Sequence, residues 1–392
     1  MRRLVFLGGA LLGVACSDGT APLPEEPDAF EVAAGAASVA AGRFHTCAIA
    51  ADGFAWCWGD NAYGQLGNGG DSMQSSVPVR VETTDRFLEL YSGYDHTCGV
   101  SVALVVLCWG RNTAGQLGDG THADRSAPVR VTGDQNYVHV APGRDHTCAL
   151  TSDRRVHCWG QNVDGQLGDG GVTPRPTPAP VFGDLEWIDV SSGRDHTCAM
   201  RAGGEVRCWG SNARGQVGNG SSIDQAQPTL VSTIAAAIRM SVGGQHSCLL
   251  ATGGQPFCWG DNTSLQLGRE QLVISAVPVG VVGAPSLANI SVGHAHSCGV
   301  THDRAVLCWG QNLAGQLGDS SEIERSEPQP VISGLLFSHV YSGGLHTCGV
   351  TARNRVHCWG ANGLGQLGDG SAAQQLLPAP VLNGQIEASN GK

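Results

Sequence analysis

Histidine and cysteine side chains lie close together in a stretch that recurs along the chain, best seen at residues 146–168, HTCALTSDRRVHCWGQNVDGQLG. His146, Cys148 and Cys158 are of the types that bind zinc. The aspartate before His146 and the threonine after it add an acid and a hydroxyl to this base, as acid–base or nucleophilic catalysis would need. The stretch therefore suggests two chemical hypotheses, a metal site and a catalytic site.

Repetition of this stretch argues against both hypotheses. The pattern occurs seven times, at intervals of 51 residues once and 50 residues five times, with His-Thr-Cys or His-Ser-Cys at the first cysteine and Cys-Trp-Gly ten positions later. An Asn-x-x-Gly-Gln-Leu-Gly motif follows, with two departures, Val217 for Leu and Leu265 for Gly. Repeats of this length are typical of propellers and solenoids.

Each unit is expected to contain a β-hairpin around a polar turn, at 151–155 in the third copy. This register places Cys148 opposite Cys158 on one face and Thr147 opposite Trp159 on the other. Directly opposed residues of antiparallel strands have the Cα separation that a disulfide needs. We therefore predict one disulfide per unit, joining Cys47 to Cys57, Cys98 to Cys108, Cys148 to Cys158, Cys198 to Cys208, Cys248 to Cys258, Cys298 to Cys308 and Cys348 to Cys358.

The remaining repeated residues are expected to be structural, because a catalytic constellation should be unique in a chain. The repeated His is expected to bond a backbone group of the neighbouring strand, and the Asn and Gln of the motif to form hydrogen bonds between blades. Gly168–Gly170 predicts a tight turn rather than a calcium loop. Core packing explains the tryptophan in each copy, at Trp58, Trp109, Trp159, Trp209, Trp259, Trp309 and Trp359. No catalytic residue, metal or cofactor is assigned, and we expect a protein that is not an enzyme.

The first 15 residues predict export from the cytoplasm. The apolar run 4–14 follows two arginines and is too short to span a bilayer, but it suits a secretory signal peptide. Ala15 before Cys16 resembles a bacterial lipobox, whose cysteine is acylated, although Gly13 and Ala15 also fit an ordinary signal-peptidase site. Cys16 is the only cysteine outside the repeats, which favours a lipoprotein of the cell envelope. Plain secretion is the alternative.

Composition limits the class of protein and of partner. The 57 Gly and 18 Pro predict many short elements joined by turns. A formal charge of −11 provides no electrostatic footprint for nucleic acid and disfavours an anionic membrane surface. Membrane contact is expected only through the N-terminal lipid. Residues 16–37 predict a tether and 385–392 a disordered tail.

The unit G-x-x-H-T-C-A-L, continued by C-W-G-x-N-x-x-G-Q-L-G, resembles the repeat of the regulator of chromosome condensation family over about residues 38–384. The resemblance implies an all-β fold, a seven-bladed β-propeller of four-stranded antiparallel blades, which we expect to be a monomeric ring. Pro378–Asn383 has no hairpin after it, and Ala37–Ala41 has no such strand before it. We therefore predict that the two ends meet in one composite blade.

The resemblance does not fix an activity. The family includes a guanine-nucleotide exchange factor, a β-lactamase inhibitor and a photoreceptor, so the fold is shared while function depends on loops. We favour a non-enzymatic, extracytoplasmic scaffold that binds a protein or envelope component through its loop faces. The alternatives are a carbohydrate-binding or hydrolytic activity on one ring face, and nucleotide exchange by family resemblance.

Apolar residues in two variable segments are candidates for partner contact. The loop after the fifth Gln-Leu-Gly carries Leu272, Val273 and Ile274, and the second hairpin carries Val102 and Leu104 where other copies are polar or glycine. Exposed apolar residues at a loop tip can mark an interface. The alternative is that each segment folds back onto its own blade.

Overall fold

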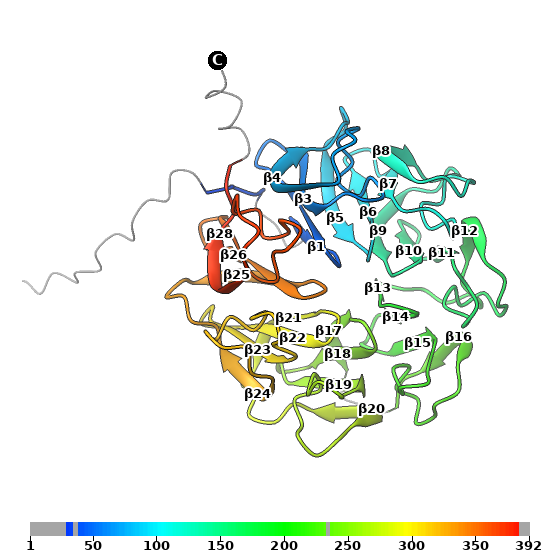
Figure 1. Cartoon of the computed structure of the whole chain (residues 1–392). Helices are drawn as coiled ribbons and strands as arrows, with labels where there is room; N and C mark the ends of the chain where they lie inside the picture. Colours follow the sequence, from blue (N-terminus) through cyan, green and yellow to red (C-terminus); the bar gives the residue numbers. More distant parts are fainter. Residues whose placement is uncertain (1–28, 34–37, 233–235, 384–392) are drawn as a thin grey trace, which may run out of the picture.

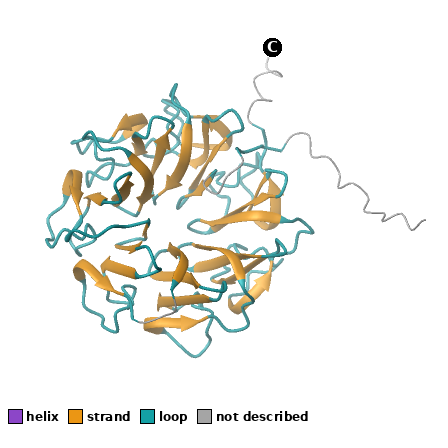
Figure 2. Ribbon diagram, turned by 180° about the vertical axis from the view of Figure 1, so that it is seen from behind, coloured by secondary structure: helices purple, strands orange, loops and turns teal. Residues whose placement is uncertain are grey.

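The computed structural model describes residues 29–33, 38–232 and 236–383 of the chain. The predicted signal peptide, Cys16, most of the tether and the tail lie outside these ranges. The described residues form 28 strands in seven four-stranded sheets arranged around an axis, which confirms the predicted all-β propeller (Figure 1). The described part of the chain contains no helix that could cross a membrane (Figure 2).

Every sheet consists of four consecutive antiparallel strands. The first strands contact one another around the axis. They are β1 (Val39–Ala41), β5 (Phe87–Ser92), β9 (Tyr137–Pro142), β13 (Asp189–Ser192), β17 (Ala237–Val242), β21 (Leu287–Val292) and β25 (Phe337–Ser342). The second strands, which begin at the repeated His, are β2 (His45–Ile49), β6 (His96–Ser101), β10 (His146–Thr151), β14 (His196–Met200), β18 (His246–Ala251), β22 (His296–Thr301) and β26 (His346–Thr351).

The third strands carry the Cys-Trp-Gly motif and are β3 (Ala55–Asp60), β7 (Val106–Gly110), β11 (Val156–Gly160), β15 (Val206–Gly210), β19 (Pro256–Asp261), β23 (Val306–Gly310) and β27 (Val356–Gly360). The fourth strands form the outer rim and are β4 (Gln74–Arg80), β8 (Arg125–Arg130), β12 (Arg175–Pro180), β16 (Gln225–Leu230), β20 (Ile274–Gly280), β24 (Arg325–Pro330) and β28 (Gln375–Pro380). Proline fits these strands because the outer edge needs no backbone donor.

The hairpin register is the one that the sequence predicts. In the third blade Cys148 pairs with Cys158 and Thr147 with Trp159. Disulfides join all seven predicted cysteine pairs, with Cα atoms 4.0 to 4.1 Å apart. The metal hypothesis is therefore wrong for these cysteines, because both sulfurs of each pair are already bonded to one another.

Antiparallel strands give the ring two distinct faces. Face I carries the loops that join the first to the second strand and the third to the fourth strand of each blade. Face II carries the hairpins between the second and third strands and the connections to the next blade. The faces matter because residues on opposite faces cannot meet in one site.

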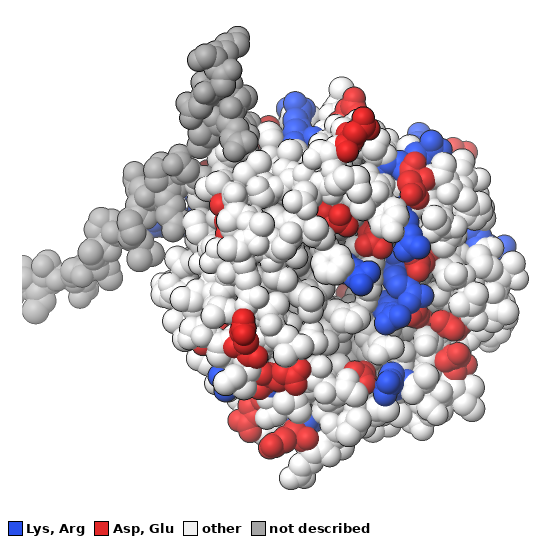
Figure 3. Space-filling model, viewed as in Figure 1, with Lys and Arg blue, Asp and Glu red and all other residues white. Residues whose placement is uncertain are grey.

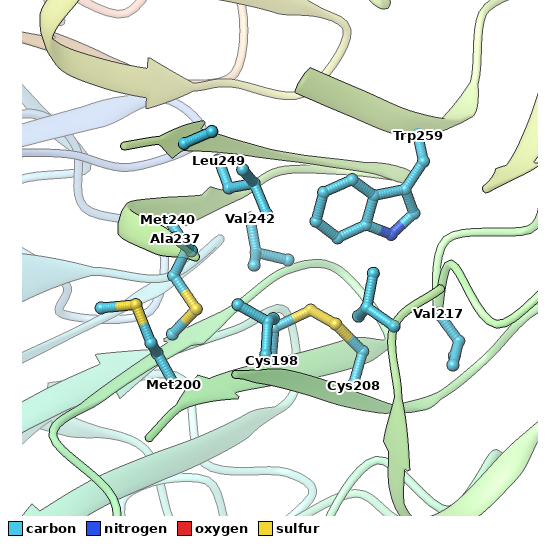
Figure 4. Packing of buried hydrophobic residues seen from close by; sticks show 12 residues of the cluster. Cys198, Met200, Cys208, Val217, Ala237, Met240, Val242, Leu249 and Trp259 are labelled. Carbon is cyan, nitrogen blue, oxygen red and sulfur yellow. A yellow bond between two sulfur atoms is a disulfide. The ribbon is translucent and has the colours of Figure 1, made fainter. Parts of the chain in front are cut away.

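The core is divided into clusters between neighbouring blades. Between blades 4 and 5, the Cys198–Cys208 disulfide packs against Trp259 and Leu249 of the next blade (Figure 4). Burying one large apolar side chain stabilises a fold by about 1.5–3 kcal/mol. Each blade therefore depends on its neighbours, and none has a complete core alone.

The predicted composite blade is wrong. Strands β1 to β4 form the first sheet and β25 to β28 form the last, so each end of the chain completes its own blade. The two blades are joined instead by residues 29–33, which we call the clasp. Phe30 N–H donates to the carbonyl of Val381 in blade 7, and Ala33 N–H donates to the carbonyl of Ile49 in blade 1. Phe30 is buried and packs on Trp58, with ring centroids 5.9 Å apart.

Candidate functional site

The seven repeated histidines form a closed hydrogen-bonded circuit rather than seven reactive sites. The Nε2 atom of each lies 2.8 to 3.0 Å from the hydroxyl of Thr or Ser in the next blade. His346 of blade 7 reaches Thr46 of blade 1, which closes the circuit. The prediction that these histidines bond backbone groups is wrong, because the hydroxyl side chain of the adjacent blade lies closer to the ring.

The circuit fixes the protonation of each imidazole. Each hydroxyl donates its single hydrogen to the backbone carbonyl of the motif's Gln, at 2.8 to 3.2 Å. The histidine must therefore donate from Nε2, and Nδ1 carries no hydrogen. Burial is the main cause that lowers the pKa of His146, His196, His45 and His296 to about 3. A neutral, immobilised imidazole of this kind is structural.

The same Gln carbonyl also accepts a hydrogen bond from the tryptophan indole of the next blade, at 2.9 to 3.0 Å. The tryptophans are buried, as predicted. The expectation of hydrogen bonds between blades is confirmed for Gln116, whose carbonyl accepts from Thr147 and Trp159 of the next blade and whose side-chain amide donates to Asp145 there. It is wrong for Asn112, which binds the backbone carbonyls of Thr121 and Ala123 in its own loop. A loop side chain satisfies nearby backbone groups at less entropic cost than a distant partner.

The residues that differ between blades meet at the axis of face I. Two positions precede each histidine in the Gly-x-x-His motif, and they are occupied by Arg43-Phe44, Tyr94-Asp95, Arg144-Asp145, Arg194-Asp195, Gly244-Gln245, His294-Ala295 and Gly344-Leu345. Ten of these fourteen residues, all except Asp195, Gly244, Gln245 and Ala295, line a depression of about 530 Å³ together with Arg111 and Gln311. We call this depression the axial hollow. Figure 3 shows basic and acidic side chains gathered to one side of the centre of the ring.

Alternating ion pairs fix one wall of the axial hollow across blades 2 to 4. Arg111 lies 3.5 Å from Asp95 and 3.4 Å from Asp145. Arg144 lies 2.8 Å from both Asp145 and Asp195. Burial raises the pKa of Asp95 and of Asp195, although the neighbouring arginines oppose this shift. The wall is therefore a rigid network whose carboxylates are already occupied by guanidinium groups.

A hydrogen bond crosses the axis between blades 2 and 6. Tyr94 Oη lies 2.7 Å from His294 Nδ1. Burial raises the pKa of Tyr94 to about 12, so the phenol keeps its proton and donates it. Burial and the charges of Arg194 and Arg43 lower the pKa of His294, which keeps the imidazole a neutral acceptor. Both residues of this bridge line the axial hollow.

Comparisons with known proteins match the repeat and the ring. The profile of the RCC1-like domain matches residues 131–391, and profiles of the regulator of chromosome condensation (RCC1) repeat match residues 52–100, 105–150 and 36–65. The chain belongs to the RCC1-like domain family.

Relatives of this RCC1-like domain differ in function. The ultraviolet-B receptor UVR8 of Arabidopsis thaliana is 39% identical over 88 residues, which cover 22% of this chain and 20% of that protein. The human probable E3 ubiquitin-protein ligase HERC3 is 37% identical over 89 residues, which cover 22% of this chain and 8% of the ligase. The chain therefore spans a small part of the curated relatives that it matches.

Solved structures share the ring. Human WBSCR16 superposes with a TM-score of 0.75 at 25% identity, over 82% of this chain and 88% of that one. Prp20p of Saccharomyces cerevisiae, whose structure was reported with its binding to Gsp1p and histones, superposes with a TM-score of 0.70 at 20% identity. The match covers 78% of this chain and 80% of Prp20p. The latter similarity shows the fold alone.

Within this RCC1-like domain, the apolar candidates from the sequence do not form one site. Val102 is 60% exposed and lies with Leu104 on a hairpin of face II. Val273 and Ile274 are 65% and 39% exposed on face I. Leu272 is half-buried beside them, with its carbonyl bound by Asn262. The two groups lie on opposite faces and in blades 2 and 5.

The axial hollow was not among the sites predicted from the sequence, although the sequence contains a signal for it. The two variable positions were visible in every Gly-x-x-His motif, beside residues that never change. The long loops between the third and fourth strands are nearly equal in length and vary mainly in composition. The short loops matter more, because all seven approach the axis while the long loops are spread around the rim.

Proposed function

We propose that this RCC1-like domain is a non-enzymatic binding scaffold, located outside the cytoplasm, that engages a protein or an envelope component through its loop faces. The observation that carries the proposal is the contrast between framework and axis. The histidines, disulfides and tryptophans repeat in all seven blades, whereas the two positions before each histidine vary among the blades, and most of them line one charged hollow. A binding site built from different residues on a repeated frame is what a scaffold requires.

Two further features support the proposed location. Seven disulfides suit an oxidising compartment. The expected signal peptide and Cys16 agree with them, although they lie outside the described residues. We propose that Cys16 carries the lipid. Globomycin should then block processing of the precursor, and labelled fatty acid should be lost in Cys16→Ser. Normal processing with globomycin would favour plain secretion.

Site-specific photocrosslinking tests the scaffold and identifies the face that binds. A benzophenone amino acid would replace Phe44 in the axial hollow, Val273 on the rim of face I or Val102 on face II. Irradiation of cells should give a discrete adduct from at least one position, and we expect it from Phe44. Absence of adducts from all three positions would contradict the scaffold proposal.

The apolar fifth loop is tested in the same cells. Changing Leu272, Val273 and Ile274 together to Ser should reduce adduct yield from Phe44 if the loop contacts the same partner. Changing Val102 and Leu104 to Ser is the matched control on face II. Unchanged yield in the first variant would remove the fifth loop from the interface.

A further inference from the structure

His139 differs from the seven histidines of the hydrogen-bonded circuit. It lies on the first strand of blade 3, β9, at a position that Glu89 occupies on β5 and Asp189 on β13, since all three pair with equivalent residues of their second strands. The first strands of neighbouring blades contact one another around the axis (Figure 1). Side chains at this position from blades 2, 3 and 4 therefore meet.

Both nitrogens of the His139 ring face an acceptor. Nδ1 lies 3.1 Å from Oε2 of Glu89 in blade 2. Nε2 lies 3.0 Å from the carbonyl oxygen of Val190 and 3.7 Å from Oδ1 of Asp189, both in blade 4. A carbonyl and an ionised carboxylate can only accept hydrogen bonds, so each ring nitrogen must carry a hydrogen to bond them. The geometry therefore requires an imidazolium, and we call Glu89, His139, Asp189 and the Val190 carbonyl the axial junction.

The surroundings of the axial junction favour this charged ring. Burial lowers the pKa of His139, but the hydrogen bond to Glu89 and the charges of Asp189 and Glu89 outweigh burial, so the net shift is upward. Burial raises the pKa of Asp189, while the charges of His139 and of Arg239 on β17 oppose this shift. The Tyr91 ring packs edge-on against the imidazole, with centroids 4.8 Å apart, and burial raises the pKa of its phenol. Tyr91 therefore orients the imidazole without carrying a charge.

Other titratable groups on and around β9 stay uncharged at neutral pH. On β6 and β10, which also pack against β9, His96 and His146 lie at the face I ends, and burial is the main cause that lowers their pKa values. Burial raises the pKa of Tyr137, on β9 itself, to about 12. His339 takes the position of His139 in blade 7, and burial is the main cause that lowers its pKa. His139 therefore changes its charge in a pH range in which these neighbours do not.

We propose that the axial junction is a pH-sensitive contact, which holds the first strands of blades 2, 3 and 4 together while His139 carries both protons and releases them when one proton is lost to the solvent. Loss of the proton leaves a nitrogen lone pair facing an acceptor and removes the cation between two carboxylates. The folded state binds this proton more tightly than the unfolded chain does. The contribution of the junction is therefore fully present below about pH 6.5 and is lost as the pH rises through the folded value.

The junction also fixes three exposed side chains on face II. Leu88, Val138 and Ile188 directly precede the three junction residues, and they are 52%, 38% and 46% exposed. Release of the junction therefore changes the arrangement of an apolar part of face II as the pH of the surroundings rises. This consequence rests on the proposed location outside the cytoplasm, where a protein meets external pH directly, whereas the junction itself does not.

Titration of the purified full chain tests the charge of His139. NMR of carbon-13-labelled histidine follows each imidazole between about pH 5 and 9, and His139→Gln and His339→Gln assign two of the signals. We expect His139 to titrate above its ordinary value of 6.5 and His339 to titrate below it. Glu89→Gln should lower the His139 midpoint, because it removes the carboxylate beside Nδ1. A His139 midpoint at or below 6.5, or one that Glu89→Gln leaves unchanged, would overturn the proposal.

Hydrogen exchange shows whether the proton holds the strands. After correction for the intrinsic effect of pH, protection of amides in β5, β9 and β13 should fall about tenfold between about pH 6 and 9 in the parent chain and in His339→Gln. His139→Gln should show no such fall, because its amide can still donate a hydrogen bond but does not titrate. An equal fall in His139→Gln, or constant protection in the parent chain, would overturn the proposal. Neither measurement involves a partner, so the scaffold proposal is decided separately by photocrosslinking.

Discussion

A hydroxyl with two partners connects each pair of neighbouring blades. Thr147 accepts a hydrogen bond from His96 of the preceding blade and donates one to the carbonyl of Gln116. Glycine makes room for the imidazole, since a Cβ at Gly143 would lie 2.4 Å from the ring of His146. The hydrogen bonds between blades therefore require a histidine, a hydroxyl residue and a glycine at these three positions, which is why the three residue types repeat in every blade.

Thr147→Val tests the hydroxyl. The change keeps the side-chain shape but leaves the buried Nε2–H of His96 without an acceptor, while the carbonyl of Gln116 keeps its bond from Trp159. The free energy of unfolding should therefore fall by about 1–3 kcal/mol. Chemical denaturation measures the loss. Thr147→Ser is the control, because Ser247 and Ser297 occupy this position in other blades. Equal stability of the Val and Ser variants would contradict the role of the hydroxyl.

Acid should destabilise the protein through its buried histidines. Burial is the main cause that lowers the pKa of His96 and His346 to about 4. It lowers the pKa of four further repeat histidines to about 3, namely His45, His146, His196 and His296. In the unfolded chain these imidazoles titrate near 6.5. The unfolded state therefore binds more protons below pH 6.5. Stability is fully present above about 6.5 and is lost as the pH falls towards the folded values.

The denaturation midpoint, measured between about pH 7.5 and 4.5, should fall steadily below about 6.5. Burial raises the pKa of Asp119 and Asp319, but hydrogen bonds from Thr121, Ser321 and neighbouring arginines lower it further, so the net shift is downward. These carboxylates therefore lose their contribution to stability only at lower pH. His139 opposes the trend. Burial disfavours its charge, but Glu89 and Asp189 raise its pKa, so its contribution is present at low pH and is lost as pH rises. A midpoint independent of pH would refute the histidine account.

The hairpin is the element on which each blade is built. Its two strands pair Cys148 with Cys158 and Thr147 with Trp159, so one pairing register supplies both the disulfide and the contact with the neighbouring blade. Trp159 donates to a carbonyl of the preceding blade, where Gly118 leaves space for the indole. The hairpin therefore links local covalent structure to the packing of the ring.

Replacing both Cys148 and Cys158 by Ser should lower the free energy of unfolding by about 2.5 kcal/mol, as loop-closure entropy for a loop of this size suggests. Thiol titration in denaturant without reductant should find none of the fourteen repeat cysteines reactive. Fourteen reactive thiols would exclude the disulfides.

The whole ring has one seam, where blade 7 meets blade 1. The His346–Thr46 bond continues the circuit across it, and the clasp adds backbone bonds from Phe30 and Ala33 to both blades. Elsewhere the chain itself connects neighbouring blades. The seam is therefore the place where loss of a few contacts should open the ring.

Phe30→Ala tests the clasp. Losing this buried ring should cost about 3–5 kcal/mol. Phe87→Ala is a matched control, because Phe87 packs on Trp109 at the same 5.9 Å centroid distance within a continuous part of the ring. Hydrogen exchange should accelerate across β1, β27 and β28 in the Phe30 variant only. Identical exchange patterns in the two variants would show that the clasp does not hold the seam.

The sequence by itself determined the blade. Seven copies of one motif, with cysteines ten residues apart, specified the hairpin register, the disulfides, the buried tryptophans and the all-β ring, because these depend on contacts local in the chain or repeated in every unit. The tertiary structure decided what depends on the closed ring: the partner of each histidine, the clasp in place of a composite blade, and the separation of Val102 from Val273. It also brought Arg43, Tyr94 and His294 together from blades 1, 2 and 6. Their proximity comes only from the meeting of seven short loops at one axis, which no local pattern encodes.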